Sequence, residues 1–491
     1  MYLPSGWEPR KEQLRLYEAA KNAFQEGKKF VFLDAPTGIG KSAIARALIE
    51  DFHDGMVATS TKQLQDQYLT DFPEFKKLVG RSNFRCRIGK CTCGEGYYMT
   101  TPMKGQREYC PRCPYVIHMA QALQSDMYVA NYSSLLYIAQ NDYRSILVLD
   151  EGHRVESELM SFLTLQISQD WAERMGLDPP DDPEDDDTMF DWAADFMDAL
   201  RGYNEPELQA EVDRITRAAG YMTSTLELHR WIPSYSEQKG KYAVEFKPLR
   251  INRVVSDNLY AKGQRVLIMS ATLLNPKEIA KSTGIAEEEY AYFNSNQAYD
   301  AERRPVYFSP SAPPVVHAMM EEAMPWLAEA ISVLMDEYPD QKGLIHTSSV
   351  KLAKYLKMNV EDPEDRLVLA HGPERTFRYN YHASTPNPTV LLSPSMTEGV
   401  DLKGDLARFI VIAKCPFMSL GDRHTSQRAK IDSDWYKTHA VRQIIQAAGR
   451  GTRDATDSCD IYVLDAKVAE LLEECEEIVP QWFWDAWIEM D

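Results

Sequence analysis

The chain has 491 residues, an apolar content of 44% and a net charge of −20. This length is enough for three or four domains with large cores, and the absence of any run of 18 apolar residues argues against a membrane span. The excess of acid excludes a uniformly basic surface, although a local basic groove that binds nucleic acid is compatible with it. Because the first residues (MYLPSGWEPRKEQ) lack the apolar core of a secretion signal, we expect a cytoplasmic protein without membrane contact.

Residues 30–42 (FVFLDAPTGIGKS) have the pattern of a strand, a glycine-containing turn and a helix start. They nearly match the phosphate-binding loop G-x-x-x-x-G-K-[ST], with Ala35 in place of the first glycine. The positions that fit are Gly38, Gly40, Lys41 and Ser42. In such a loop the backbone N–H groups and the helix N-terminus bind phosphate oxygens. We expect Lys41 to reach the β- and γ-phosphates of ATP and Ser42 to ligate Mg²⁺.

Residues 144–151 (RSILVLDE) predict a buried parallel strand that ends in two carboxylates. The carboxyl end of such a strand is where α/β sheets bind ligands. Asp150 is therefore expected to hold the Mg²⁺ that Ser42 also contacts, and Glu151 to orient or deprotonate the attacking water. The loop and this strand together predict hydrolysis of Mg-ATP.

The cysteines are unevenly distributed. Five of the eight fall in one short segment: Cys86, Cys91, Cys93, Cys110 and Cys113. This distribution favours a metal site over a disulfide scaffold. Four thiolates can hold zinc or an iron–sulfur cluster, and the spacing does not decide between them. One of Cys91 and Cys93 is expected to be spare, and the basic residues between positions 76 and 90 suit contact with a phosphate backbone.

Short apolar strands alternate with helical patterns, which predicts two parallel sheets covered on both faces. The first set of strands comprises residues 29–34, 55–60, 144–150 and 265–270, and the second comprises 342–347, 389–395, 408–414 and 460–465. Two segments interrupt the first set: the cysteine segment, and residues 160–255, which are polar, acidic and partly helical in pattern. A turn-rich linker between the sheets is expected near residues 309–314.

Residues 446–453 (QAAGRGTR) follow a helical run and contain two arginines three positions apart. We expect Arg450 and Arg453 to reach across a domain gap and stabilise charge on the transferred γ-phosphate, and Gln446 to contact ATP. ATP would then lie between two domains, and its binding and hydrolysis would close and reopen the cleft.

Taken in order, these motifs resemble the XPD/DinG branch of superfamily 2 helicases over nearly the whole chain. The region from Arg10 to Gln13 is similar to an adenine-sensing glutamine motif, APTGIGKS to motif I, ATSTKQLQDQY to motif Ia and DEGH to motif II. MSATLLNP resembles motif III, KGLIHTSS motif IV, LLSPSMTEGVDLKGD motif V and QAAGRGTR motif VI. Gly152 stands in motif II where many relatives carry alanine.

The resemblance implies an α/β fold with two RecA-like (P-loop NTPase) motor domains, an inserted iron–sulfur domain and a helical arch domain. The first motor domain would comprise residues 1–83, 125–159 and 256–304, and the second residues 305–491. The cluster domain would span residues 84–124 and the arch residues 160–255.

The resemblance also assigns residues. A [4Fe–4S] cluster would be bound by Cys86, Cys93, Cys110 and Cys113, with Cys91 as the alternative to Cys93 and zinc as the alternative metal. Arg10 and Gln13 would contact the nucleotide, Asp401 would link DNA contact to the ATP cleft, and His153 would couple the metal site to Ser270 and Thr272. DNA phosphates would be held by Thr59, Lys62, Gln63, Ser395, Thr397 and Glu398.

The activity implied is that of an ATP-dependent DNA helicase or translocase moving 5′→3′ on single-stranded DNA and unwinding duplexes in replication, repair or recombination. We expect a monomer acting on single-stranded and forked DNA, in the cytoplasm or nucleoid of a bacterium or in the host cytoplasm if phage-encoded. One alternative is a DNA-stimulated ATPase that remodels nucleoprotein without separating strands. The other is a metal-dependent nucleic-acid-binding adaptor that uses ATP as a switch.

Overall fold

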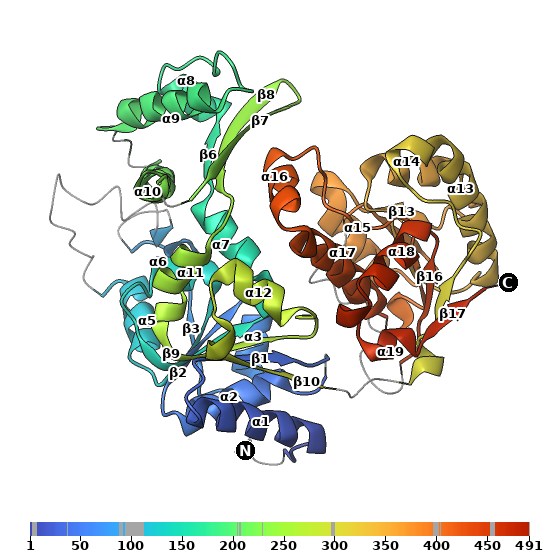
Figure 1. Ribbon diagram of the computed structural model, residues 1–491, viewed down its shortest axis with the longest axis horizontal. Coiled ribbons are helices and arrows are strands. Elements are labelled where there is room, and N and C mark those ends of the chain that lie inside the picture. Colours follow the sequence, from blue (N-terminus) through green and yellow to red (C-terminus); the bar gives the residue numbers. More distant parts are fainter. Residues whose placement is uncertain are drawn as a thin grey trace.

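The chain forms two α/β units beside one another and a third, smaller unit above the first (Figure 1). The computed structural model describes residues 1, 7–36, 38–87, 92–93, 112–203, 205, 208–227, 229–295, 300–395, 402, 404–451 and 457–490. Within these residues no helix is long and apolar enough to cross a membrane. We call the three units the first sheet domain, the second sheet domain and the insert (residues 165–248).

The first sheet domain is built on seven strands, all paired in parallel. Their order across the sheet is β10 (Tyr290–Asn294), β1 (Phe30–Asp34), β9 (Gly263–Ser270), β5 (Arg144–Asp150), β2 (Gly55–Thr59), β4 (Met127–Asn131) and β3 (Lys76–Leu78). Alternate residues of β1 pack on opposite faces: Phe30 and Phe32 belong to one core, Val31 and Leu33 to the other. The near-continuous apolar strands are explained by this two-sided burial.

Helices cover both faces of the first sheet. One face carries α1 (Lys11–Gln25), α2 (Lys41–Asp51) and α3 (Lys62–Asp71). The other carries α5 (Pro114–Leu123), α6 (Tyr132–Tyr137), α7 (Val155–Leu163), α11 (Asn252–Asn258) and α12 (Pro276–Thr283). The phosphate-binding loop therefore leaves β1 toward α2, and the DEGH motif leaves β5 toward α7.

The second sheet domain repeats this architecture with another parallel seven-stranded sheet. The order is β13 (Leu367–Leu369), β14 (Val390–Ser393), β12 (Gly343–His346), β15 (Phe409–Ile412), β16 (Asp460–Val463), β11 (Val306–Phe308) and β17 (Trp487–Glu489). One face is covered by α13 (Met320–Glu337) and α14 (Val350–Asn359), and the other by α17 (Ser433–Ala448), α18 (Ala466–Glu474) and α19 (Gln481–Trp484). Two further helices, α15 (Arg375–Ser384) and α16 (Arg423–Ile431), flank the domain.

The insert contains a sheet that the sequence reasoning missed. Residues 160–255 were expected to be helical, and α8 (Gln169–Arg174), α9 (Asp186–Leu200) and α10 (Gln209–Thr225) are present. An antiparallel sheet is formed by β6 (Leu165–Ser168), which precedes α8, and by β7 (Trp231–Gln238) and β8 (Lys241–Pro248), which follow α10; its order is β6, β8, β7. Every second residue of β8 is buried, so the residues between them can be polar. Because of these polar residues, the strand was not recognised from the sequence.

Three further features differ from the expectations. The chain passes from the first sheet to the second between β10 and β11, so the turn-rich residues 309–314 lie inside the second sheet domain, between β11 and α13, and do not link the sheets. Six short or edge strands were not predicted: β3, β4, β10, β11, β13 and β17. The proposed boundaries at 160 and 255 fall inside α7 and α11, which carry the chain into and out of the insert.

Candidate nucleotide and nucleic-acid site

The phosphate-binding loop has the backbone that its glycines allow. Gly38 and Gly40 have φ angles of +88° and +92°, and Gly40 is the residue immediately before α2. The Arg10 guanidinium donates to the carbonyl of Gly38, and the Gln13 amide donates to the carbonyl of Gly40 at 3.2 Å. Arg10 and Gln13, at the start of α1, are therefore anchored to the loop, and their expected contact with the nucleotide stays a prediction.

Lys41 and Asp150 lie near one another at the carboxyl ends of β1 and β5. The Lys41 ammonium donates to the carbonyls of Ala35 at 2.8 Å and Pro36 at 3.4 Å. Asp150 accepts hydrogen bonds from the Tyr68 hydroxyl at 3.1 Å and from the backbone N–H of Glu151 at 3.0 Å. Burial and the neighbouring Glu151 raise the pKa of Asp150 to about 6, while the charge of Lys41 opposes the shift.

Mg²⁺ fits this group of residues because it prefers hard oxygen ligands. Asp150 supplies a buried carboxylate whose direction is fixed by two hydrogen bonds. Ser42, the second residue of α2, supplies a half-buried hydroxyl at the other side of the loop.

A chain of hydrogen bonds runs from Glu151 to the second sheet domain. The Ser270 hydroxyl, at the end of β9, lies 3.5 Å from the Glu151 carboxylate and 2.7 Å from Nδ1 of His153. Nε2 of His153 is 3.1 Å from the Gln446 amide of α17, which also donates to the Thr272 hydroxyl at 2.8 Å. Burial lowers the pKa of His153 well below its usual range, so the ring is neutral and can accept from Gln446.

Two residues that sequence reasoning missed hold the segment after β9. Asp34 accepts from the backbone N–H groups of Leu273 at 3.3 Å and Leu274 at 2.9 Å. From the second sheet domain, Arg442 donates to the carbonyls of Thr272 at 3.1 Å and Leu273 at 3.3 Å. The signals were available, because Asp34 directly precedes the loop and Arg442 lies one helical turn before Gln446.

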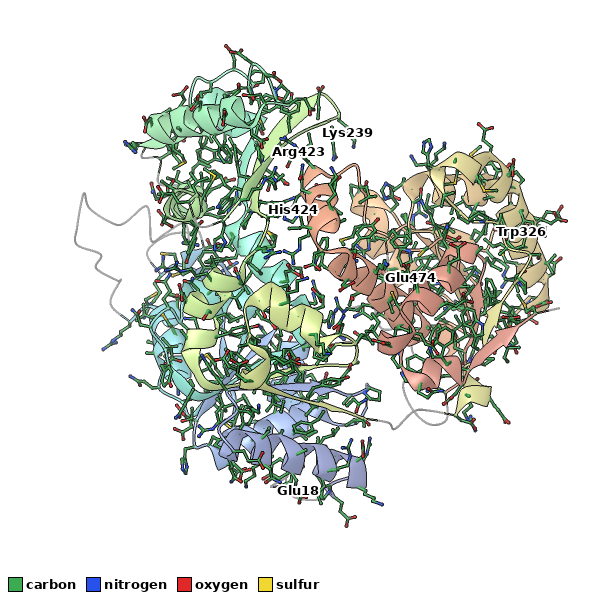
Figure 2. The ribbon with its side chains drawn as sticks, viewed as in Figure 1. Glu18, Lys239, Trp326, Arg423, His424 and Glu474 are labelled. Atoms are coloured by element: carbon green, nitrogen blue, oxygen red, sulfur yellow. The ribbon has the colours of Figure 1, made fainter. Side chains whose placement is uncertain are left out.

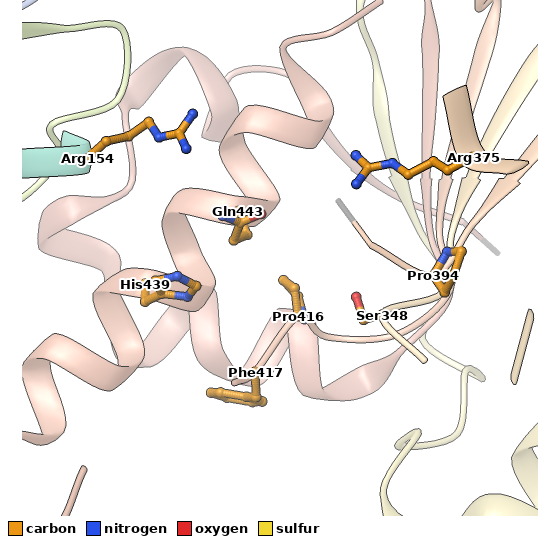
Figure 3. Close-up of a pocket in the computed structure, with 8 residues that line it drawn as sticks. All are labelled: Arg154, Ser348, Arg375, Pro394, Pro416, Phe417, His439 and Gln443. Carbon is orange, nitrogen blue, oxygen red and sulfur yellow. The ribbon is translucent and has the colours of Figure 1, made fainter. Parts of the chain in front are cut away.

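A cavity of about 460 Å³ lies where the two sheet domains meet. Its lining residues are Arg154, Ser348, Arg375, Pro394, Pro416, Phe417, His439 and Gln443. Arg154, from the first sheet domain, and Arg375, from α15, point toward one another across it (Figure 3). The Phe417 ring is stacked on Tyr436 with 5.3 Å between centroids and 11° between planes. The cavity therefore combines two guanidinium groups with a supported aromatic face.

Comparison with known proteins agrees with this arrangement. Residues 6–173 match the family described as type III restriction enzyme, res subunit, and residues 331–486 match the helicase C-terminal domain. An XPD helicase structure superposes with a TM-score of 0.69 and 16% identity, covering 98% of this chain and all of that one. The fold is that of the XPD helicases. The Xpd4 structure of S. tokodaii gives a TM-score of 0.62 at 15% identity, with 98% of this chain and all of that chain covered.

Comparison of sequences also finds a helicase. The ATP-dependent DNA helicase DinG of Photobacterium profundum is 22% identical over 262 residues, which are 49% of this chain. The match spans 37% of that relative's length. The α/β fold with two RecA-like domains, predicted from the sequence, is confirmed by the XPD structures.

Four of the residues expected to contact DNA are described, and they lie at or just after the ends of strands of the two sheets or at the start of the next helix. The Thr59 hydroxyl, at the end of β2, donates to the carbonyl of Thr61 at 3.2 Å, and Lys62 and Gln63 are exposed in the first turn of α3. Ser395 is exposed just after β14. Thr397, Glu398 and Asp401 lie outside the described residues.

The predicted arginine pair is described only in part. Arg450 lies two residues after the end of α17, and burial together with the positive charge of Arg450 lowers the pKa of His346, in β12, to about 3. Arg453 lies outside the described residues, so the expected reach of both arginines to a γ-phosphate stays a prediction.

Three of the five clustered cysteines are described. Cys93 and Cys113 are buried with their sulfurs 3.6 Å apart, and Cys86 is half-buried. Two thiolates on one tetrahedral zinc are separated by about 3.8 Å, given Zn–S bonds of about 2.3 Å, so the pair fits a metal site. Cys91 and Cys110 lie outside the described residues, and within the described part no three potential ligands converge.

The structure explains why motif II has a glycine at position 152. A methyl group at this position would overlap the Ile268 side chain of β9. The Ile268 side chain therefore occupies the space that an alanine methyl at position 152 would need, which explains why glycine fits here.

Proposed function

We propose that this chain is an ATP-dependent DNA helicase that moves 5′→3′ on single-stranded DNA. The observation that carries the proposal is the chain of hydrogen bonds from Glu151 through His153 to Gln446. The chain begins at Glu151, the residue expected to orient the attacking water in the first RecA-like domain. It ends at Gln446 in α17, a helix of the second RecA-like domain. A change at the γ-phosphate can therefore alter the fit between the two domains, which a motor requires.

Within the nucleotide site, this chain's own groups supply most of the chemistry. Gly38, Gly40 and the start of α2 offer N–H groups to phosphate oxygens, Lys41 offers a positive charge, and Glu151 orients or deprotonates the attacking water. Mg²⁺ held by Ser42 and Asp150 would neutralise charge on the phosphates. Arg450 and Arg453 would add positive charge from the second sheet domain.

The cavity between the sheet domains supports single-stranded DNA as the substrate. An aromatic face and flanking guanidinium groups are the features that bind unpaired bases and phosphates without regard to sequence. The exposed strand-end residues Thr59, Lys62, Gln63 and Ser395, with Thr397 and Glu398, would continue the path along both domains, and Asp401 would link it to the ATP cleft.

A metal in the cysteine segment is part of the proposal. Cys86, Cys93, Cys110 and Cys113 would hold a [4Fe–4S] cluster, with Cys91 in reserve. Zinc is the second candidate, because four thiolates can hold either a zinc ion or an iron–sulfur cluster.

The experiment is strand displacement on 5′-tailed, 3′-tailed and forked duplexes with ATP. The proposal expects displacement of the 5′-tailed and forked substrates, with Lys41→Ala inactive as the control. DNA-stimulated hydrolysis without displacement would support a translocase that remodels nucleoprotein. DNA binding without hydrolysis, equal in wild type and Lys41→Ala, would support the adaptor.

A further inference from the structure

The insert is held against the second sheet domain by α16. The Arg423 guanidinium donates to the carbonyl of Pro233 in β7 at 3.1 Å, and Nε2 of His424 donates to the carbonyl of Pro248 at the end of β8, also at 3.1 Å. Figure 2 shows Arg423 and His424 at this boundary, next to the hairpin that carries Lys239. Two side chains of the second sheet domain thus bind backbone of the insert.

Arg428, one helical turn further along α16, is the centre of the contact. Its side chain is 1% exposed, although arginine is rarely buried to this extent. One terminal nitrogen donates to the carbonyl of Leu249 at 2.5 Å, and the other lies 3.1 Å from the Glu156 carboxylate. The guanidinium lies over the Trp435 ring, and the Trp435 indole N–H donates to Glu156 at 2.9 Å.

These partners belong to the two connections between the first sheet domain and the insert. Glu156 is the second residue of α7, which begins just after the DEGH motif and leads outward to β6. Leu249 follows β8, where the chain returns toward α11. Arg428, from the second sheet domain, therefore contacts both segments that connect the first sheet domain with the insert.

Further charges surround this junction. Asp432 lies 3.8 Å from Arg428 and 3.0 Å from Lys281 of α12, and Arg442 lies 3.8 Å from the buried Glu278 of α12. Separating the sheet domains would divide Arg428 from Glu156 and Asp432 from Lys281, although Asp432 would stay beside Arg428, and removing a buried arginine from its carboxylate is unfavourable. The junction can therefore transmit a movement of one domain to the other rather than absorb it.

We propose that Arg428 is a positioning residue that fastens the base of the insert, where α7 leads into it and Leu249 leads out of it, to the second sheet domain, so that closing and opening of the cleft move the insert. The consequence for unwinding rests on the proposed helicase function. The physical link does not, because it consists of contacts within the chain.

The link is tested by fluorescence energy transfer between dyes at Lys239 in the insert and Met358 on α14. Unnatural amino acids carry the dyes, because the chain has eight cysteines. Wild type and Lys430→Met, an exposed site on α16, should give one narrow distance distribution. Arg428→Met and the double variant Arg428→Met/Glu156→Met should give a broader distribution with a larger mean distance.

The double variant guards against simple unfolding, since replacing both members of a buried ion pair by apolar residues leaves no unpaired charge. If the double variant is folded by circular dichroism and keeps the wild-type distance distribution, the proposal is overturned.

The second measurement is the number of base pairs opened per ATP hydrolysed on a forked duplex. We expect this ratio to fall at least about three-fold in the double variant, while DNA-stimulated hydrolysis stays within about two-fold of wild type. An unchanged ratio in a variant with a mobile insert would contradict the coupling. If wild type itself opens no duplex, the helicase proposal fails and the distance measurement still decides the link.

Discussion

Gly40 shows how one residue meets two demands at the nucleotide site. Its φ of +92° is in the left-handed region, and a methyl group at this position would overlap the Gln13 amide. Gly40→Ala should therefore lower stability by about 1–2 kcal/mol and also weaken ATP binding, because it displaces Gln13 and the loop.

The matched control is Gly176→Ala in the insert, where φ is +73° and no atom lies within 4 Å of the added methyl. This variant should lose similar stability without any change in ATP affinity. Thermal unfolding and nucleotide titration measure the two effects, and equal ATP affinity in both variants would show that the Gln13 contact is unimportant.

Asp150 is expected to oppose folding while it serves catalysis. Its pKa of about 6 in the folded chain lies above its usual value of 3.8, so between these pH values the folded state holds a proton that the unfolded state has released. Its contribution to the free energy of unfolding therefore falls as pH rises from about 4 to 6 and stays low above that.

Asp150→Asn should consequently raise the free energy of unfolding of the Mg²⁺-free protein at pH 8 by about 1–3 kcal/mol, with little effect at pH 3.5. The same variant should lose ATP hydrolysis, because the carboxylate for Mg²⁺ is gone. Denaturant titrations at both pH values test the first statement, and a variant that is less stable at pH 8 would refute it.

At the scale of elements, the cysteine segment is a small unit joined to a large one. Cys93, Cys113 and Tyr115 form a separate core, while the rest of α5 packs on β3 and β4 of the first sheet. Within the described part of the segment this core has three buried residues, two of which are candidate metal ligands, so we expect a bound metal to contribute to its stability.

Removing the metal, or changing Cys113 to Ser, should therefore unfold the segment while leaving the first sheet domain folded. We expect DNA-independent ATP hydrolysis to remain within about two-fold of wild type and proteolysis to cut first between residues 84 and 113. Metal analysis and an absorbance spectrum of anaerobically purified protein identify the ion, and a colourless sample containing zinc would remove the cluster assignment. Full resistance to protease after metal removal would contradict this account.

The loop after β15 brings Phe417 into the cavity between the sheet domains. Its ring is 37% exposed and stacks on Tyr436. Because Tyr436 already holds the ring in place, a base can stack on the exposed face with little further loss of side-chain entropy. Phe417→Ala should weaken binding of single-stranded DNA by about 1–3 kcal/mol, which raises Kd roughly 5-fold to 160-fold. Phe377 on α15 is more exposed, at 66%, and does not line the cavity, so Phe377→Ala is the control and should bind normally. Fluorescence anisotropy at fixed salt measures both, and a loss in the control alone would move the DNA path elsewhere.

At the scale of the whole molecule, Gln446 is where the two sheet domains meet around the nucleotide site. Gln446→Ala removes its contacts with His153 and Thr272 but no group that touches the phosphate-binding loop. We expect ATP affinity to be retained and the maximal rate of DNA-stimulated hydrolysis to fall at least about ten-fold. Gln443→Ala, one turn earlier and lining the cavity, should instead weaken DNA binding. Steady-state kinetics separates these effects, and a raised KM for ATP with an unchanged rate in Gln446→Ala would contradict the coupling role.

Much of the architecture could be predicted from local patterns. The central strands β1, β2, β5, β9, β12, β14, β15 and β16 are apolar on both faces and follow one another with helices between, which the residues alone reveal. The edge strands β3, β10, β13 and β17 and the sheet of the insert were missed, because a strand with one solvent-exposed face can be polar at every second position and short at the edge. The interior strands β4 and β11 were missed as well, although β4 is buried.

The sequence by itself determined the chemistry at the nucleotide site: the glycines, lysine, hydroxyl and carboxylates have fixed spacings along the chain, and each follows a strand whose end can be recognised. Only the tertiary structure decided how distant segments meet. Asp34 and Arg442 hold the segment after β9, Ile268 fills the space beside Gly152, and Arg428 joins α7, the return from β8 and α16. These contacts join residues far apart in sequence. A local sequence pattern does not determine which distant residues will contact one another in the folded chain.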